Sequence, residues 1–315
     1  MAERIPLWKK LNLSSLMIGV GCVIAGMGAA SLYGNLMILS GTLCMVFAAF
    51  SQLSANMANR YYDERHALGA GIDQKISAKR QPTATSMLKE CAVAMFLLAI
   101  MVGLAILTMC GWWVLPIGIF IVVAGWLCSN GETPLMRTPL SPLVAFFLFG
   151  PVCVISSYLV QTIPDAIHPI GWYDVQPAVY IGIAFGFLAA NANIVYNYAR
   201  YYPDLRNCRS SLVTELGRKN SRIIFLVSTL ASFATALAMC LSPDTHCGWL
   251  DFSTAIVPLC INLYVWHKMR SLPRQQLYKL TGVANANVLI TALICFVVFT
   301  LTGLPDESPS SYFGL

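Results

Sequence analysis

Charged residues are scarce in this 315-residue sequence: they make up 11% of it, whereas 57% of the residues are hydrophobic. The mean hydropathy is +0.67. A soluble globular domain carries about 25% charged residues. A chain with so few charges cannot cover a surface that faces water, so we expect its outer surface to face lipid.

Cysteine pairs of the kind that bind metals or form disulfide frameworks are also missing. The eleven cysteines include no C-x-x-C pair and show no metal-type spacing. Only Cys247 clearly faces outward, with Cys240 near the boundary, so we expect no disulfide framework. The others suit the use of cysteine as a small buried apolar residue.

Long intervals without charge predict the membrane spans. Residues 11–59 and 91–131 are each long enough for two crossings of about 20 residues. They break at Tyr33-Gly34-Asn35 and at Cys110-Gly111-Trp112. Single spans are expected at 138–164, 175–199, 223–243, 252–267 and 280–305, which gives nine transmembrane helices. The 252–267 window is short and must take length from its flanks.

The distribution of charge predicts the orientation in the membrane. With the amino terminus inside, all 20 Lys and Arg residues fall in inner segments. The only charged residues of the outer segments are acidic: Asp165, Asp174, Asp244, Asp251, Asp306 and Glu307. The positive-inside rule therefore predicts a multi-pass protein of the inner (cytoplasmic) membrane, with the amino terminus in the cytoplasm and the carboxyl terminus outside. The net charge of +6 suits orientation and anionic lipid, so no nucleic-acid partner is expected.

We expect one polytopic domain, residues 1–315, with a weak internal repeat. The first half (1–137) and the second half (138–279) have the same order of connections, and a last span (280–305) follows. Four spans return the chain to its starting side, so the two four-helix repeats would be parallel. Each half has one long polar inner loop, 60–89 and 200–222, and any chemistry is expected there.

The first loop follows a helix end that carries Asn56, Asn59 and Asp63. The spacing i, i+3, i+7 places these side chains on one helical face. Asp73 lies beyond them, and Lys79-Arg80 leads into the next span.

The second loop has a matching arrangement in the other half. Asn193, Asn197, Arg200 and Asp204 are spaced i, i+4, i+7, i+11. They share one face if the helix continues through Pro203. The two helix ends are therefore expected to close on one site from opposite sides.

Two interpretations of these ends are open. Asp and Asn oxygens suit Mg²⁺, Arg and Lys bind phosphate oxygens, and an apolar bundle accepts a hydrocarbon tail. Together these features indicate a lipid-tailed diphosphate. Alternatively, the basic residues only orient the protein, and the Asn and Asp residues cap helix ends.

Four segments resemble signature segments of the UbiA superfamily of membrane prenyltransferases. They are NMANRYYD with GID following, AKRQPT, FFLFGPVCVISSYLVQT and YNYARYYPDLRNCRSSLVTELG. The resemblance is greatest to the branch that prenylates dihydroxynaphthoate on the way to menaquinone. It implies nine transmembrane helices around a central cavity, and transfer of a polyprenyl group from its diphosphate to an aromatic acceptor.

The resemblance also implies roles for individual residues. Mg²⁺ held by aspartates would bind the allylic diphosphate, which assigns Asp63, Asp73 and Asp204 as metal ligands. The resemblance assigns Asp63 and Asp204 as catalytic residues, and we add Arg60 and Arg200, which occupy positions where the family has aspartates. The expected substrate-binding residues are Asn56, Asn59, Asn197, Lys79, Arg80 and Arg209.

Three positions depart from the family pattern. Arg60 and Arg200 stand where the family has aspartates, and Pro142 stands where the naphthoate branch has an acidic residue. One hypothesis is that the two arginines act as fixed cations on the diphosphate and replace at least one Mg²⁺. The alternative is that the site has decayed.

Three functions therefore compete. The first is the prenyltransferase, and the second is a catalytically weak or inactive relative that binds an isoprenoid or a quinone. The third is a secondary transporter, which the lack of charge away from the cytoplasmic ends of the spans disfavours.

Overall fold

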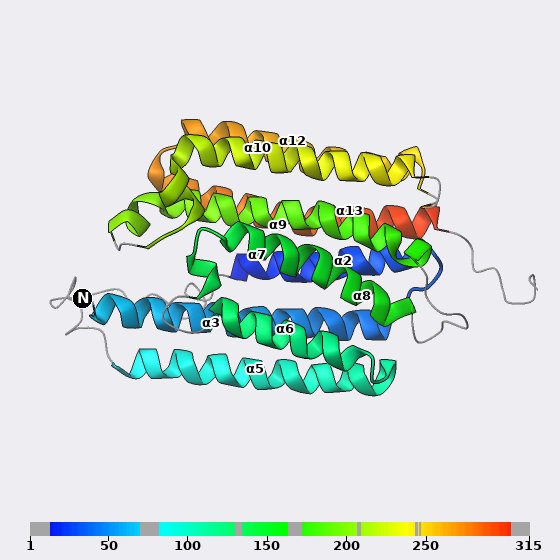
Figure 1. The fold of residues 1–315 in the computed structure, drawn as a ribbon, viewed down its shortest axis with the longest axis horizontal. Helices are drawn as coiled ribbons and strands as arrows, with labels where there is room; N and C mark the ends of the chain where they lie inside the picture. Colours follow the sequence, from blue (N-terminus) through cyan, green and yellow to red (C-terminus); the bar gives the residue numbers. More distant parts are fainter. Residues whose placement is uncertain are drawn as a thin grey trace, which may run out of the picture.

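The computed structural model describes residues 13–69, 82–129, 134–162, 172–206, 209–242, 245 and 247–303, and these form helices without any strand. The helices run nearly parallel or antiparallel along one axis (Figure 1). Their bounds are α2 (Leu16–Ser31), α3 (Ile38–Gly69), α5 (Pro82–Cys110), α6 (Val114–Ser129), α7 (Ser141–Phe147), α8 (Cys153–Thr162), α9 (Trp172–Arg206), α10 (Leu212–Leu241), α11 (Trp249–Ser253), α12 (Ile256–Ser271) and α13 (Arg274–Thr302).

Eight helical segments of the described chain are long and apolar enough to cross a membrane. The predicted span 252–267 is longer in the structure, as expected. Helices α11 and α12 together form the segment Trp249–Ser271 of 23 residues. Helix α6 is also apolar but has only 16 residues. The all-helical membrane architecture is thus confirmed. The count of nine crossings, the internal repeat and the sidedness stay predictions.

Both predicted hairpin breaks are confirmed. The chain turns between α2 and α3 at Gly34, with φ of 75°, and between α5 and α6 at Gly111, with φ of 90°. A positive φ is accessible to glycine because it has no Cβ, so a single glycine allows each tight turn.

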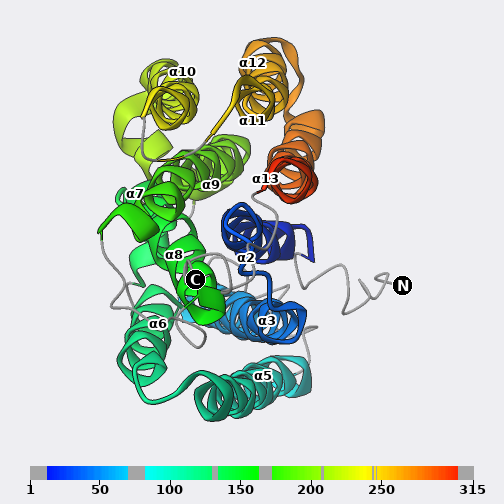
Figure 2. The same ribbon diagram turned by 90° about the vertical axis from the view of Figure 1, so that its right-hand side faces the viewer.

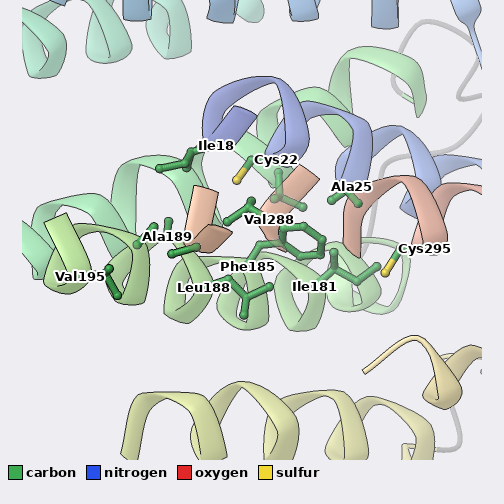
Figure 3. Packing of buried hydrophobic residues seen from close by; sticks show 14 of the residues in the cluster. Ile18, Cys22, Ala25, Ile181, Phe185, Leu188, Ala189, Val195, Val288 and Cys295 are labelled. Atoms are coloured by element: carbon green, nitrogen blue, oxygen red, sulfur yellow. The ribbon is translucent and has the colours of Figure 1, made fainter. Parts of the chain in front are cut away.

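The core is built where α2, α9 and α13 pack together. Figure 3 shows side chains such as Cys22, Phe185 and Val288 meeting between these helices. Small residues let the helices approach closely: a Cβ on Gly21 of α2 would lie 3.2 Å from the Leu289 Cα in α13. Close backbone approach through small residues is typical of helix packing in membranes.

Helices α7 and α8 form one kinked span. They are joined by a π-helical turn, Leu148–Val152, that contains Pro151. Proline cannot donate to the preceding turn, which accounts for the irregular geometry. At this turn Gly150 lies against Gly182 and Gly186 of α9, and a Cβ on Gly150 would meet their backbone atoms.

Seen end-on, the helices form two groups (Figure 2). Helices α3, α5 and α6 lie on one side, and α9, α10, α12 and α13 lie on the other. Helix α2 packs against both α3 and α13, and the α7–α8 span packs against α9. The residues that line the main cavity come from both groups, so the arrangement places the two polar helix ends around one space.

Candidate functional site

A cavity of about 790 Å³, here called the central cavity, lies between the two groups of helices. Most of its wall is apolar, with Phe47, Leu104, Leu107, Val114 and Phe149 among the lining side chains. Along α3 the lining runs from Cys44 to Arg60. At 1.5 Å per residue this is a depth of about 24 Å, which suits an extended hydrocarbon chain.

One end of the central cavity is polar, and both predicted sets of polar residues contribute to it. The set on α3 is here called the first constellation, and the set on α9 is called the second constellation. Helix α3 supplies Asn56, Asn59 and Arg60, and α9 supplies Asn193, Tyr196 and Arg200. Arg209 follows α9, and Arg137 comes from the turn Leu135–Arg137 before α7. The structure therefore brings the two helix ends to one site, as the matching positions in the sequence predict.

Arg200 and Asp204 form an ion pair one turn apart on α9. Arg200 Nε donates to Asp204 Oδ1 at 3.2 Å. Asp204 is fully buried and does not line the central cavity, whereas the Arg200 side chain is 26% exposed and does. Arg200 Nη1 also donates to the Tyr196 hydroxyl at 3.0 Å. Two partners on its own helix thus orient the guanidinium toward the cavity.

Helix α9 continues through Pro203 to Arg206, so the second constellation is helical throughout. Its members separate into two layers. Asn193 lines the cavity, while Asn197 lies behind it, 1% exposed. Asn197 Nδ2 donates to Asn193 Oδ1 at 2.9 Å and to Ser141 Oγ at 3.1 Å. Asn197 therefore holds Asn193 in place from behind the wall.

The first constellation is anchored by neighbours from other elements. Asn56 Nδ2 donates to Ser15 Oγ at 2.7 Å, and Arg137 Nη2 donates to the Asn59 carbonyl at 2.9 Å. Arg137 is a residue of this site that no sequence pattern indicated. Its one signal is that it is the only basic residue in the sequence between α6 and α7.

Several predicted residues fall outside the description. Asp63 belongs to α3, but its side chain is not among those described. Asp73, Lys79 and Arg80 lie in the interval 70–81, outside the described residues. Their expected roles as metal ligands and substrate-binding groups stay predictions. Pro142 is buried in the first turn of α7.

The described residues do not fit a Mg²⁺ ion. Magnesium binds through oxygen ligands, usually with one or two carboxylates. Among the described residues that line the central cavity there are four arginines and no Asp or Glu. Asp204 is oriented toward Arg200, and no group of three His, Cys, Asp or Glu residues gathers anywhere in the described part of the chain.

Comparisons with known proteins agree with this architecture. The sequence model of the UbiA prenyltransferase family matches residues 16–288. A 1,4-dihydroxy-2-naphthoate octaprenyltransferase of Bacillus subtilis (strain 168) is 21% identical over 290 residues, covering 91% of this chain and 90% of that protein.

Two solved structures have the same fold. A UbiA homolog from Aeropyrum pernix K1 aligns with a TM-score of 0.61 and 14% identity, covering 90% of this chain and 97% of that one. A UbiA homolog from Archaeoglobus fulgidus bound to GPP and Mg²⁺ aligns with a TM-score of 0.60 and 14% identity, covering 93% and 98%.

Proposed function

The chain belongs to the UbiA prenyltransferase family, and from this premise we propose that it transfers a polyprenyl group from its diphosphate to an aromatic acceptor. The acceptor class that its relatives favour is a dihydroxynaphthoate, since a curated relative of nearly the same length carries that activity in its name. The product would then enter menaquinone biosynthesis.

The observation that carries this proposal is the division of the central cavity into two chemically different parts. An apolar length of about 24 Å runs along α3 and ends at a cluster of arginines. An allylic diphosphate with a long tail has the same division, because its hydrocarbon part avoids water and its head is an anion. Arginine binds phosphate oxygens through planar, charge-assisted hydrogen bonds.

The orientation of the substrate in the cavity sets the chemistry. With the diphosphate at the arginines, the carbon bonded to it would lie near Tyr196, which lines the cavity beside Arg200. The carbon–oxygen bond breaks, its electron pair leaves with the diphosphate, and the arginines stabilise the departing charge. An electron-rich aromatic carbon of the acceptor then bonds to the allylic carbon, and the acceptor loses a proton or a carboxylate.

The arginine end is expected to face the cytoplasm, since the charge distribution places all Lys and Arg residues there. Soluble precursors and the released diphosphate would reach the site from that side. The tail would enter from the bilayer of the inner membrane.

The direct test is prenyl transfer by the purified full-length protein in detergent. Geranyl or farnesyl diphosphate and dihydroxynaphthoate serve as substrates, with Mg²⁺ in one sample and EDTA in the other. Prenylated product in either sample supports the proposal. Product only with Mg²⁺ supports a conventional site built on Asp63, Asp73 and Asp204.

A second candidate is a relative that binds an isoprenoid or a quinone without chemistry, and the arginines in place of family aspartates favour it. Tight binding of geranyl diphosphate without product in either sample would support this candidate and contradict the enzyme. The positive control is the same assay with an active prenyltransferase of the family, which shows that the substrates are intact.

A further inference from the structure

We propose that the diphosphate of the substrate is bound by an arginine clamp composed of Arg60, Arg137, Arg200 and Arg209, without a metal ion as an obligatory ligand, and that Asp204 is a positioning residue for Arg200. This inference rests on the proposed function for the identity of the anion. It adds Arg137 to the site and gives Asp204 a role other than metal binding.

The charge of the cavity wall is the first argument. Four guanidinium groups from three separate parts of the chain line the polar end of the central cavity, and no described carboxylate lines it. Among the described residues, the buried carboxylate near this end of the cavity is that of Asp204, and it pairs with Arg200 at 3.2 Å. The charge of this described part of the wall favours a multiply charged anion over a divalent cation.

The second argument is the geometry of Arg200. Asp204, one turn further along α9, accepts a hydrogen bond from Nε, and Tyr196, one turn before, accepts one from Nη1 at 3.0 Å. Arginine loses less conformational freedom on binding when its planar group is already oriented. Asp204 thus contributes to anion binding through Arg200, without contacting the substrate.

The third argument is the position of Arg137. It comes from the turn before α7, and its Nη2 donates to the Asn59 carbonyl at 2.9 Å. This contact fixes the guanidinium beside Asn59, the residue that precedes Arg60 on α3. The clamp is therefore assembled from α3, from the turn before α7 and from the end of α9 with the residues after it.

The test is binding of inorganic pyrophosphate to the full-length protein in detergent, measured by calorimetry with EDTA and with Mg²⁺. We expect affinities that agree within about threefold between the two conditions. Arg137→Gln should weaken binding in EDTA by about ten- to a hundredfold, the range for a lost hydrogen bond to a charged group. The matched control is Arg206→Gln, because Arg206 is an exposed arginine at the end of α9 that does not line the cavity. It should bind as the parent does.

The role of Asp204 needs a readout that general destabilisation does not change. In steady-state transfer, Asp204→Asn should raise the KM for the allylic diphosphate and leave the KM for the acceptor unchanged. Asp204→Glu, which keeps the charge, should recover part of the affinity for pyrophosphate. Equal increases in both KM values, with no recovery by glutamate, would overturn the positioning role.

Failure of the clamp and failure of the proposed function give different results. Pyrophosphate binding that disappears in EDTA, or that is unchanged in Arg137→Gln, overturns the clamp even when prenyl transfer proceeds with Mg²⁺. Binding that persists in EDTA and weakens in Arg137→Gln supports the clamp, even when no acceptor is prenylated.

Discussion

Arg200 Nε lies 3.2 Å from Asp204 Oδ1, and the two residues differ in what surrounds them: the carboxylate is fully buried and the guanidinium reaches the central cavity. Because of this asymmetry, removing Arg200 and removing Asp204 should lower the free energy of unfolding by different amounts. A buried charge without its partner is destabilising by about 3–5 kcal/mol, whereas a charge that reaches a polar cavity keeps part of its solvation.

Arg200→Gln is therefore expected to lower the free energy of unfolding by about 3–5 kcal/mol, and Asp204→Asn by clearly less. The double variant Arg200→Gln/Asp204→Asn should be more stable than Arg200→Gln alone, because no charge is left buried. Thermal melting in detergent measures all three. Additive losses in the double variant would contradict the coupling of the two residues.

The open space beside α6 predicts control of the prenyl chain length. Gly118 lines the central cavity, and a Cβ built there would meet no atom within 4 Å. Gly118→Leu should therefore fold normally but occupy space in the cavity. We expect its activity to fall more with geranylgeranyl diphosphate than with geranyl diphosphate.

The matched control is Gly282→Leu, since Gly282 also has no atom within 4 Å of a built Cβ but does not line the cavity. Its ratio of long-chain to short-chain activity should equal that of the parent. Unchanged chain preference in Gly118→Leu would mean that the tail does not pass α6.

The contact between Gly150 and α9 predicts a large loss of stability from one methyl group. A Cβ at this position would meet backbone atoms of Gly182 and Gly186, which cannot move as a flexible side chain can. Gly150→Ala should lower the free energy of unfolding by about 1–3 kcal/mol. Gly282→Ala, in open space, should be neutral or slightly stabilising; equal melting temperatures for the two variants would contradict the close approach.

Cys247 lies in the connection between α10 and α11, and burial, together with Asp251, raises its pKa to about 12. The thiol should react very slowly with maleimides at pH 7–8, because only the thiolate is nucleophilic. Between pH 9 and 12 the unfolded chain releases this proton and the folded protein keeps it. The contribution of Cys247 to stability therefore falls as pH rises through this range. Rapid labelling of Cys247 at neutral pH in a variant without other cysteines would contradict its burial.

The architecture was predictable because charge is so unevenly distributed along the chain. Glycines at the two expected breaks, Gly34 and Gly111, take positive φ values, and the flanking helices begin and end close to the expected residues. The family and its fold also follow from the motifs. The partners of each polar side chain do not, because they depend on how the helices pack.

The second constellation illustrates the difference. Its spacing correctly places four residues on one broad face of α9, yet only Asn193 and Arg200 line the cavity. At about 100° per residue, Arg200 lies about 20° to one side of Asn193, and Asn197 and Asp204 lie about 20–40° to the other. Which edge of the face borders the cavity is decided by α7, whose Ser141 contacts Asn197. Arg137 was not predicted because a single arginine in a short segment has no sequence pattern. Its place at the site depends on how the helices pack.

Helix α6 has a consequence for the lipid around the protein. Its 16 residues measure about 24 Å, about 6 Å less than the hydrocarbon core of a typical bilayer. A bilayer becomes thinner beside a short apolar helix, which brings the lipid head groups closer to the bilayer centre. Because α6 forms one wall of the central cavity, we expect the bilayer to be thin beside the cavity that the proposed polyprenyl substrate would enter.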